Sequence, residues 1–117
     1  KQTITPNIAA WDTSNVTDMS YLFSGASVYN GVLSYWNTAK VTNMSYAFAN
    51  ALEYNQDLGD WNTSQVTQMD AMFSNATAFN QNLSGWCVSL IDKAPTNFST
   101  DSLISQTSLP LWGTCPD

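Results

Sequence analysis

One tryptophan recurs every 25 residues along the chain, as Trp11, Trp36, Trp61 and Trp86. The segments 11–35, 36–60 and 61–85 each begin at one of these residues and share residue types at most of their positions. A fixed period of this length is typical of repeat proteins, in which each repeat buries its apolar face against its neighbours. We therefore expect three consecutive coils of a solenoid.

The two flanking segments are incomplete versions of the same repeat. In residues 1–10, Ile8 stands at the position of Leu33 and Ile4 at the position of Tyr29, which indicates the closing half of a repeat. In residues 86–117, Trp112 follows Trp86 by 26 residues instead of 25. We expect a degenerate fourth coil there that acts as a C-terminal cap, with no separate cap at the N-terminal end.

Within each repeat the apolar residues first follow a helical spacing and then a short extended one. Val66, Met69 and Phe73 are three and four residues apart, which predicts one face of a short helix. The threonines Thr17, Thr42 and Thr67 precede this stripe as expected N-caps. A leucine three residues before each tryptophan predicts a brief strand. The predicted repeat core is Trp11, Trp36, Trp61, Trp86, Val16, Val41, Val66, Met19, Met44, Met69, Phe23, Phe48, Phe73, Leu33, Leu58 and Leu83.

These elements predict an α/β repeat fold, a right-handed βα solenoid that is leucine-rich-repeat-like, with short parallel strands and short helices. The phrase WNTSQVTQMDAMFSNATAFNQNLSGW, over residues 61–86, resembles the repeat of the BspA-like group of leucine-rich-repeat surface proteins of unknown function. The consensus of that group is similar to WDTSxVTxMxxMFxxAxxFNQxLSxW. The resemblance covers residues 11–86 and implies a cell-surface or secreted location and a role in adhesion. It brings no catalytic residues.

The charge pattern excludes several classes of function. The chain has three Lys, no Arg and no His, with a formal net charge of -6. Nucleic-acid binding needs clustered cations, so we expect none. The lack of histidine removes the commonest general base and transition-metal ligand. We expect no enzyme activity, no catalytic residues, no metal and no cofactor.

The two cysteines lie beyond the last full repeat. Cys87 and Cys115 would close one terminal segment, which favours a disulfide over a metal site that usually needs three or four ligands. A disulfide indicates an oxidising compartment, so we expect an extracellular, cell-surface or secreted protein. No apolar run approaches the ~20 residues of a membrane span, and we expect no direct membrane insertion.

Several residues are candidates for contact with a partner. Tyr21, Tyr35 and Tyr46 vary between repeats and stand outside the apolar stripe, whereas Ile4 and Ile8 lie at an uncapped N-terminal end. The tryptophan column could instead stack sugars, although we favour core packing. The threonine columns could order water or ice, although local hydrogen bonds are the simpler explanation.

Two further kinds of site are weaker candidates. Six sequons, at Asn15, Asn43, Asn62, Asn75, Asn82 and Asn97, offer possible N-glycosylation in a eukaryotic secretory pathway. Asp12 and the other acids show no calcium-ligand spacing, so a solvated face is the expectation.

The sequence thus predicts a non-enzymatic cell-surface or secreted repeat module for adhesion, which binds a protein or a glycan at a cell surface. The alternative is a structural subunit of an extracellular filament or surface layer, in which copies join end to end. A water- or ice-ordering threonine ladder is the weakest of the three.

Overall fold

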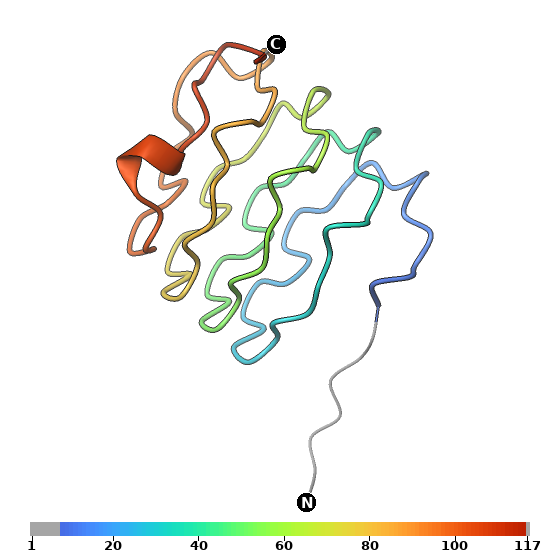
Figure 1. Ribbon diagram of the computed structural model, residues 1–117, viewed down its shortest axis with the longest axis vertical. Coiled ribbons are helices and arrows are strands. Elements are labelled where there is room, and N and C mark those ends of the chain that lie inside the picture. The colour runs from blue at the N-terminus through green and yellow to red at the C-terminus, as the bar shows by residue number, and fades with distance from the viewer. Residues whose placement is uncertain (1–7, 117) are drawn as a thin grey trace, which may run out of the picture.

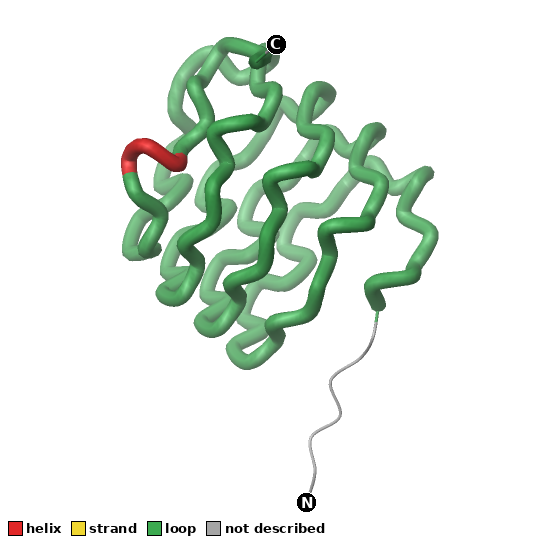
Figure 2. Tube along the Cα trace, viewed as in Figure 1, coloured by secondary structure: helices red, strands yellow, loops and turns green. Residues whose placement is uncertain are grey.

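The computed structural model describes residues 8–116, which wind as a series of coils lying side by side (Figure 1). Regular secondary structure in this range is limited to one 3₁₀ helix, η1 (Gln106–Ser108), and two isolated parallel bridges. The bridges pair Asp18 with Asn43, and Asn43 with Gln68. The rest of the described chain is turns and loops (Figure 2). The predicted right-handed βα solenoid of leucine-rich-repeat type is therefore wrong, because its helices and its strands do not form.

Backbone hydrogen bonds explain why the helical spacing does not give a helix. The N–H groups of Met19 and Phe23 donate to the carbonyls of Asn43 and Ala47 in the next repeat, at 2.8 and 2.7 Å. Between them, the N–H of Leu22 donates to the carbonyl of Met19, three residues back. An α-helix needs every N–H to reach the carbonyl four residues back. Overlapping turns therefore replace the helix, and alternate N–H groups join neighbouring coils.

Two positions in each repeat have a positive φ, which a right-handed helix does not allow. The first holds Tyr21, Tyr46 and Ala71, at φ values of 61°, 61° and 55°. The second holds Gly25, Asn50 and Asn75, at 76°, 61° and 58°. In each of the first two repeats, each of these two positions is the third residue of a four-residue turn. The N–H of the fourth residue donates to the carbonyl of the first, and a positive φ at the third residue makes the turn type II. Glycine and asparagine tolerate this conformation, and tyrosine does not.

The tryptophan column packs in the core and joins the coils. Each of three indole N–H groups donates to the backbone carbonyl of the residue 28 positions earlier. The pairs are Trp36 to Ile8 (3.0 Å), Trp61 to Leu33 (2.9 Å) and Trp86 to Leu58 (2.8 Å). All three tryptophans are buried, so they offer no row of faces to a sugar.

Threonine hydroxyls form a second ladder, which lies inside the molecule. Thr13, Thr38 and Thr63 are buried, and each hydroxyl donates to a carbonyl 24 residues ahead, at 2.7 to 3.0 Å. This column cannot order surface water. The expected N-cap role of Thr42 and Thr67 is also wrong, because no helix follows them; their hydroxyl and N–H groups donate to the carbonyl of the residue 25 positions earlier.

An asparagine ladder runs along the exposed side of the coils. The N–H groups of Asn55 and Asn80 donate to the Oδ1 atoms of Asn30 and Asn55, both at 2.9 Å. Gln81 Nε2 also donates to Asn55 Oδ1 at 2.9 Å. The amide side chains thus satisfy turn N–H groups in the next coil.

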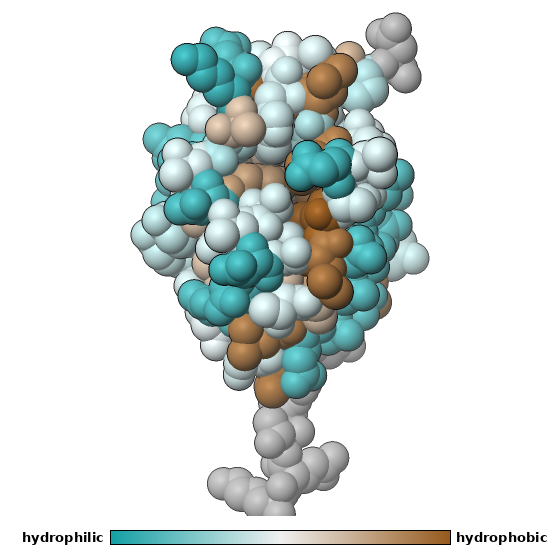
Figure 3. Space-filling view, turned by 90° about the vertical axis from the view of Figure 1, so that its left-hand side faces the viewer, coloured by the Kyte–Doolittle hydropathy of each residue, from teal (hydrophilic) through white to brown (hydrophobic). Residues whose placement is uncertain are grey.

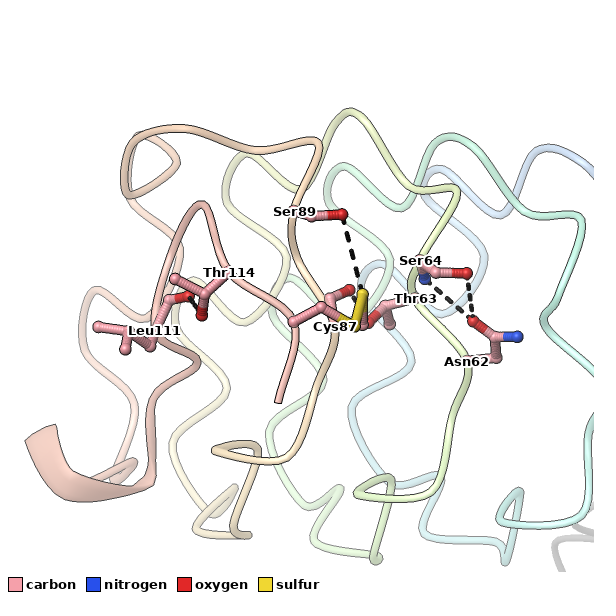
Figure 4. Close-up of a disulfide and its surroundings, with 8 residues drawn as sticks. Asn62, Thr63, Ser64, Cys87, Ser89, Leu111 and Thr114 are labelled. Atoms are coloured by element: carbon pink, nitrogen blue, oxygen red, sulfur yellow. Dashed lines mark hydrogen bonds between the residues drawn. A yellow bond between two sulfur atoms is a disulfide. The ribbon is translucent and has the colours of Figure 1, made fainter. Parts of the chain in front are cut away.

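The C-terminal segment closes the stack through the disulfide Cys87–Cys115, as predicted (Figure 4). The N–H of Val88 donates to the carbonyl of Thr114 at 2.8 Å, which ties the end of the chain beside the bridge. Within the cap, the rings of Trp112 and Phe98 pack edge to face, with their centroids 5.0 Å apart. The cap also accepts four backbone N–H groups of repeat 61–85: those of Ala71, Phe73, Asn75 and Leu83.

Candidate interaction surface

The structure buries most of the predicted repeat core, and the exceptions lie in the first repeat. Trp11 is 61% exposed, whereas Trp36 in the same column is 5% exposed. Val16 and Phe23 are only partly buried and pack against the edge of the core. These residues are less covered because no described coil precedes them. The other predicted core residues are buried.

The expected interaction role of Ile8 is wrong. Its side chain is 7% exposed and belongs to the hydrophobic core, and its carbonyl accepts the indole N–H of Trp36. Ile8 is therefore the first core residue of the part of the chain that the structure describes. Ile4 lies outside the described residues.

Two of the three candidate tyrosines form a stacked pair on the surface. The ring centroids of Tyr21 and Tyr46 are 4.7 Å apart and their planes differ by 3°. The side chains are 59% and 39% exposed. In the third repeat the same position holds Ala71, which is buried, so the column is two rings long. Tyr35 is 85% exposed.

The backbone under this pair is in an unfavourable conformation. Tyr21 and Tyr46 both have a φ of 61°. A left-handed conformation costs a residue with a side chain roughly 1–2 kcal/mol. Asn50 and Asn75 occupy the second positive-φ position at little cost, so the fold does not need an aromatic residue in such a turn. Strain of this kind is found most often where it serves a function.

The acidic side chains of the first repeat hydrogen-bond within their own turns. The hydroxyl and the backbone N–H of Ser14 both donate to the carboxylate of Asp12. These bonds lower the pKa of Asp12, and the hydroxyl has the larger effect. The side chain and backbone N–H of Ser20 lower the pKa of Asp18 in the same way. Both carboxylates are exposed and stay ionised. Within residues 8–116 no group of three or more His, Cys, Asp or Glu side chains could hold a metal.

The cap carries an open depression of about 270 Å³. Its lining residues are Ala94, Pro95, Asn97, Phe98, Ser99, Thr100, Leu109 and Trp112. Small-molecule sites usually measure about 300–1,000 Å³, so the depression is small for such a ligand. Seen from the cap end, apolar residues form a narrow band between polar ones (Figure 3). Leu90, Leu103 and Leu111 are the exposed leucines of this segment.

The sequon asparagines differ in their accessibility. Asn15, Asn62, Asn82 and Asn97 are exposed, whereas Asn43 and Asn75 are half-buried. Asn43 lies at the centre of both bridges, and Asn75 Nδ2 donates to Asn50 Oδ1 at 2.7 Å. A glycan on Asn75 would have to replace its bond to Asn50, whereas the bridges of Asn43 involve its backbone and not its side-chain amide.

Sequence reasoning missed two features of this surface. It did not single out Leu22, which is 46% exposed although Ala47 and Met72 at the same position are buried. It also missed the positive φ of the tyrosines. The sequence held one indication of such turns. Gly25 and Asn50, residue types that favour a positive φ, stand four residues after Tyr21 and Tyr46.

Comparison with known proteins gives a family and no individual relative. The model of the family described as "Mycoplasma protein of unknown function, DUF285" matches residues 1–112. No curated protein and no solved structure matches the chain. In the described residues no helix is long and apolar enough to cross a membrane.

Proposed function

The chain belongs to the DUF285 family, a membership that brings no activity with it, and we propose that it is a non-enzymatic module that binds a protein or a glycan. The observation that carries this proposal is the exposed, stacked pair of Tyr21 and Tyr46 on a strained backbone. The fold would be more stable with asparagine at either position. Binding supplies a reason for the rings to be there.

The chemistry of the pair suits flat, weakly polar partners. Tyrosine offers a large rigid face and a hydroxyl, and loses little conformational entropy on contact. The two rings stack with their centroids 4.7 Å apart and hold each other in place, so the ring surfaces that remain exposed are preorganised. Such a surface fits the apolar face of a sugar ring or the side chains of a protein loop.

The location at a cell surface or outside the cell is part of the same proposal. The disulfide Cys87–Cys115 supports it, because such bonds persist in oxidising compartments. The resemblance of the repeats to BspA-like surface proteins supports it as well. Hydrogen bonds lower the pKa values of Asp12 and Asp18, which argues against either carboxyl as a general acid, because that role needs a raised pKa.

The test is a screen of the whole chain against glycan and protein arrays, followed by variants of the pair. The double variant Tyr21→Asn/Tyr46→Asn removes both rings and keeps residues that tolerate a positive φ. We expect it to lose binding at least about tenfold while remaining folded, since exposed aromatic residues are frequent hot spots. Leu90→Asn, at an exposed position of the cap, is the matched control and should bind normally. Equal binding by the double variant would refute the proposal.

A further inference from the structure

The first repeat has an edge that no other coil of residues 8–116 covers, and this edge carries the same backbone groups as the interior coils. We call it the leading edge and define it by the carbonyls of Asp18, Ser20, Leu22 and Ser24. In repeats 36–60 and 61–85, the carbonyls at these four positions each accept an N–H from the preceding repeat, at 2.7 to 3.0 Å. The donors are always the alternate N–H groups of the turn segment. The coil-to-coil contact is therefore directional, with donors on one side and acceptors on the other.

The leading edge has no such partner within residues 8–116. None of the backbone N–H groups in that range donates to any of its four carbonyls. The carbonyl of Thr17, in contrast, accepts the N–H of Thr42 from the other side at 2.8 Å. Unpaired acceptors in a row are a ready template for another chain segment.

Apolar side chains are uncovered along the same edge. Leu22 is 46% exposed, whereas Ala47 and Met72 at the equivalent positions are 2% and 0% exposed. Trp11 is 61% exposed and Trp36 only 5%. In the interior repeats the preceding coil supplies this cover. The same kind of coil would restore it here.

We propose that the leading edge binds a coil of the same 25-residue repeat pattern, supplied by a separate polypeptide segment. The incoming coil donates four alternate backbone N–H groups to the carbonyls of the edge and covers Leu22. The indole N–H of Trp11 donates to one of its carbonyls, as that of Trp36 does to Ile8 at 3.0 Å. The contact continues an interface that the chain already forms twice, between its own repeats.

A second copy of the folded chain does not fit this edge. Two leading edges placed face to face would oppose acceptors with acceptors, and the exposed carboxylates of Asp12 and Asp18 would repel their counterparts. The opposite end of the molecule cannot supply the donors either. There the cap already accepts the N–H groups of Ala71, Phe73 and Asn75. The occupant must have its donor edge free.

The experiment uses the whole chain and a synthetic peptide with blocked termini and the sequence of residues 33–57, which contains the carbonyl of Leu33 and stops one position before the equivalent of Ile8. Isothermal titration should show saturable binding of one peptide per chain. The matched control peptide carries N-methyl groups on the amides of Met44, Tyr46, Phe48 and Asn50, which donate to the following repeat in the structure. It keeps every side chain and loses four donors, so we expect binding at least about tenfold weaker.

A variant of the edge provides the second test. Leu22→Glu should weaken peptide binding about tenfold or more, since it places a charge in the apolar contact. Leu90→Glu, at a comparably exposed position of the cap, should leave binding unchanged. Absence of peptide binding, or equal binding by the N-methylated peptide, overturns the proposal. Dimerisation of the chain alone in sedimentation equilibrium, abolished by Leu22→Glu, would assign the edge to a second copy and also overturn it.

Discussion

The hydroxyl of Tyr54 is a buried polar group without a partner, so its removal should stabilise the protein. Tyr54 is fully buried, and its hydroxyl accepts and donates no hydrogen bond within the described structure. The same position in the next repeat holds Phe79, which is equally buried and has no hydroxyl. Tyr54→Phe therefore copies a solution that the chain already uses.

The expected gain follows from the desolvation of one hydroxyl. A buried unsatisfied polar group costs about 1–3 kcal/mol. The variant keeps the ring contacts with Phe48, at 4.6 Å, and with Phe79, at 6.2 Å. The small void left by the oxygen subtracts a part of the gain. We expect the free energy of unfolding to rise by about 1–2 kcal/mol, measured by urea denaturation with an unchanged slope.

The pH dependence of stability gives an independent reading of the same group. Burial, and next the proximity of Tyr29, raise the pKa of Tyr54 far above its ordinary value of 10.0. Above pH 10.0 the phenol of Tyr54 loses its proton in the unfolded chain and keeps it in the folded chain. The free energy of unfolding therefore falls as the pH rises. Below pH 10.0 the contribution is constant. Tyr54→Phe should flatten the loss of stability above pH about 10.

The control is Tyr29→Phe, one repeat earlier in the same column. Tyr29 is 8% exposed and its hydroxyl is not among the buried groups without a partner. We expect a change within about 0.5 kcal/mol for this variant. If Tyr54→Phe instead lowers stability, or if both variants behave alike, the hydroxyl of Tyr54 has a partner and the reasoning fails.

Four further results are expected. Phe73→Ala should lower the free energy of unfolding by about 3–5 kcal/mol in urea melts and Tyr46→Ala by much less, because only Phe73 is fully buried; equal losses would contradict this assignment. Cys115→Ser should cost about 3–4 kcal/mol, measured in the same way, and leave the far-ultraviolet circular dichroism of the repeats intact; complete unfolding would show that the cap nucleates the stack. Asn75→Gly should be about 1 kcal/mol more stable than Asn75→Ala, because its φ is 58° and only glycine adopts it freely; equal stabilities would mean that the turn rearranges. In acid titrations, Asp12→Asn should reduce the loss of stability that follows as pH falls below 3.8, since the contribution of its lowered pKa is present above that value and disappears below it; an unchanged acid profile would count against the Ser14 bonds.

The core columns could be predicted because they depend only on spacing. A 25-residue period places Met44 and Met69, or Phe48 and Phe73, at equivalent positions of neighbouring coils, whatever the backbone does between them. All four are buried. The disulfide was predictable for a similar reason, since only two cysteines exist and both lie in the terminal segment.

The conformation of each coil could not be predicted from the same spacing. Met69 and Phe73 are four residues apart, which one turn of helix and a pair of overlapping β-turns satisfy equally well. The choice depends on where the N–H groups donate, and the neighbouring coil accepts those of Ala71 and Phe73 at 2.8 Å. That partner is 25 residues away, so no local pattern contains it.

By itself, the sequence determined the repeat length, the columns that face the core and the closing bridge, because a periodic chain must bury its apolar residues against its own copies. Only the tertiary structure decided that alternate N–H groups join the coils and that turns replace helices and strands. It also decided that Ile8 is buried while Leu22 is exposed. The physical reason is the same in each case. The acceptors of the backbone N–H groups and the burial of the side chains depend on contacts between coils, and these contacts form only when the coils stack.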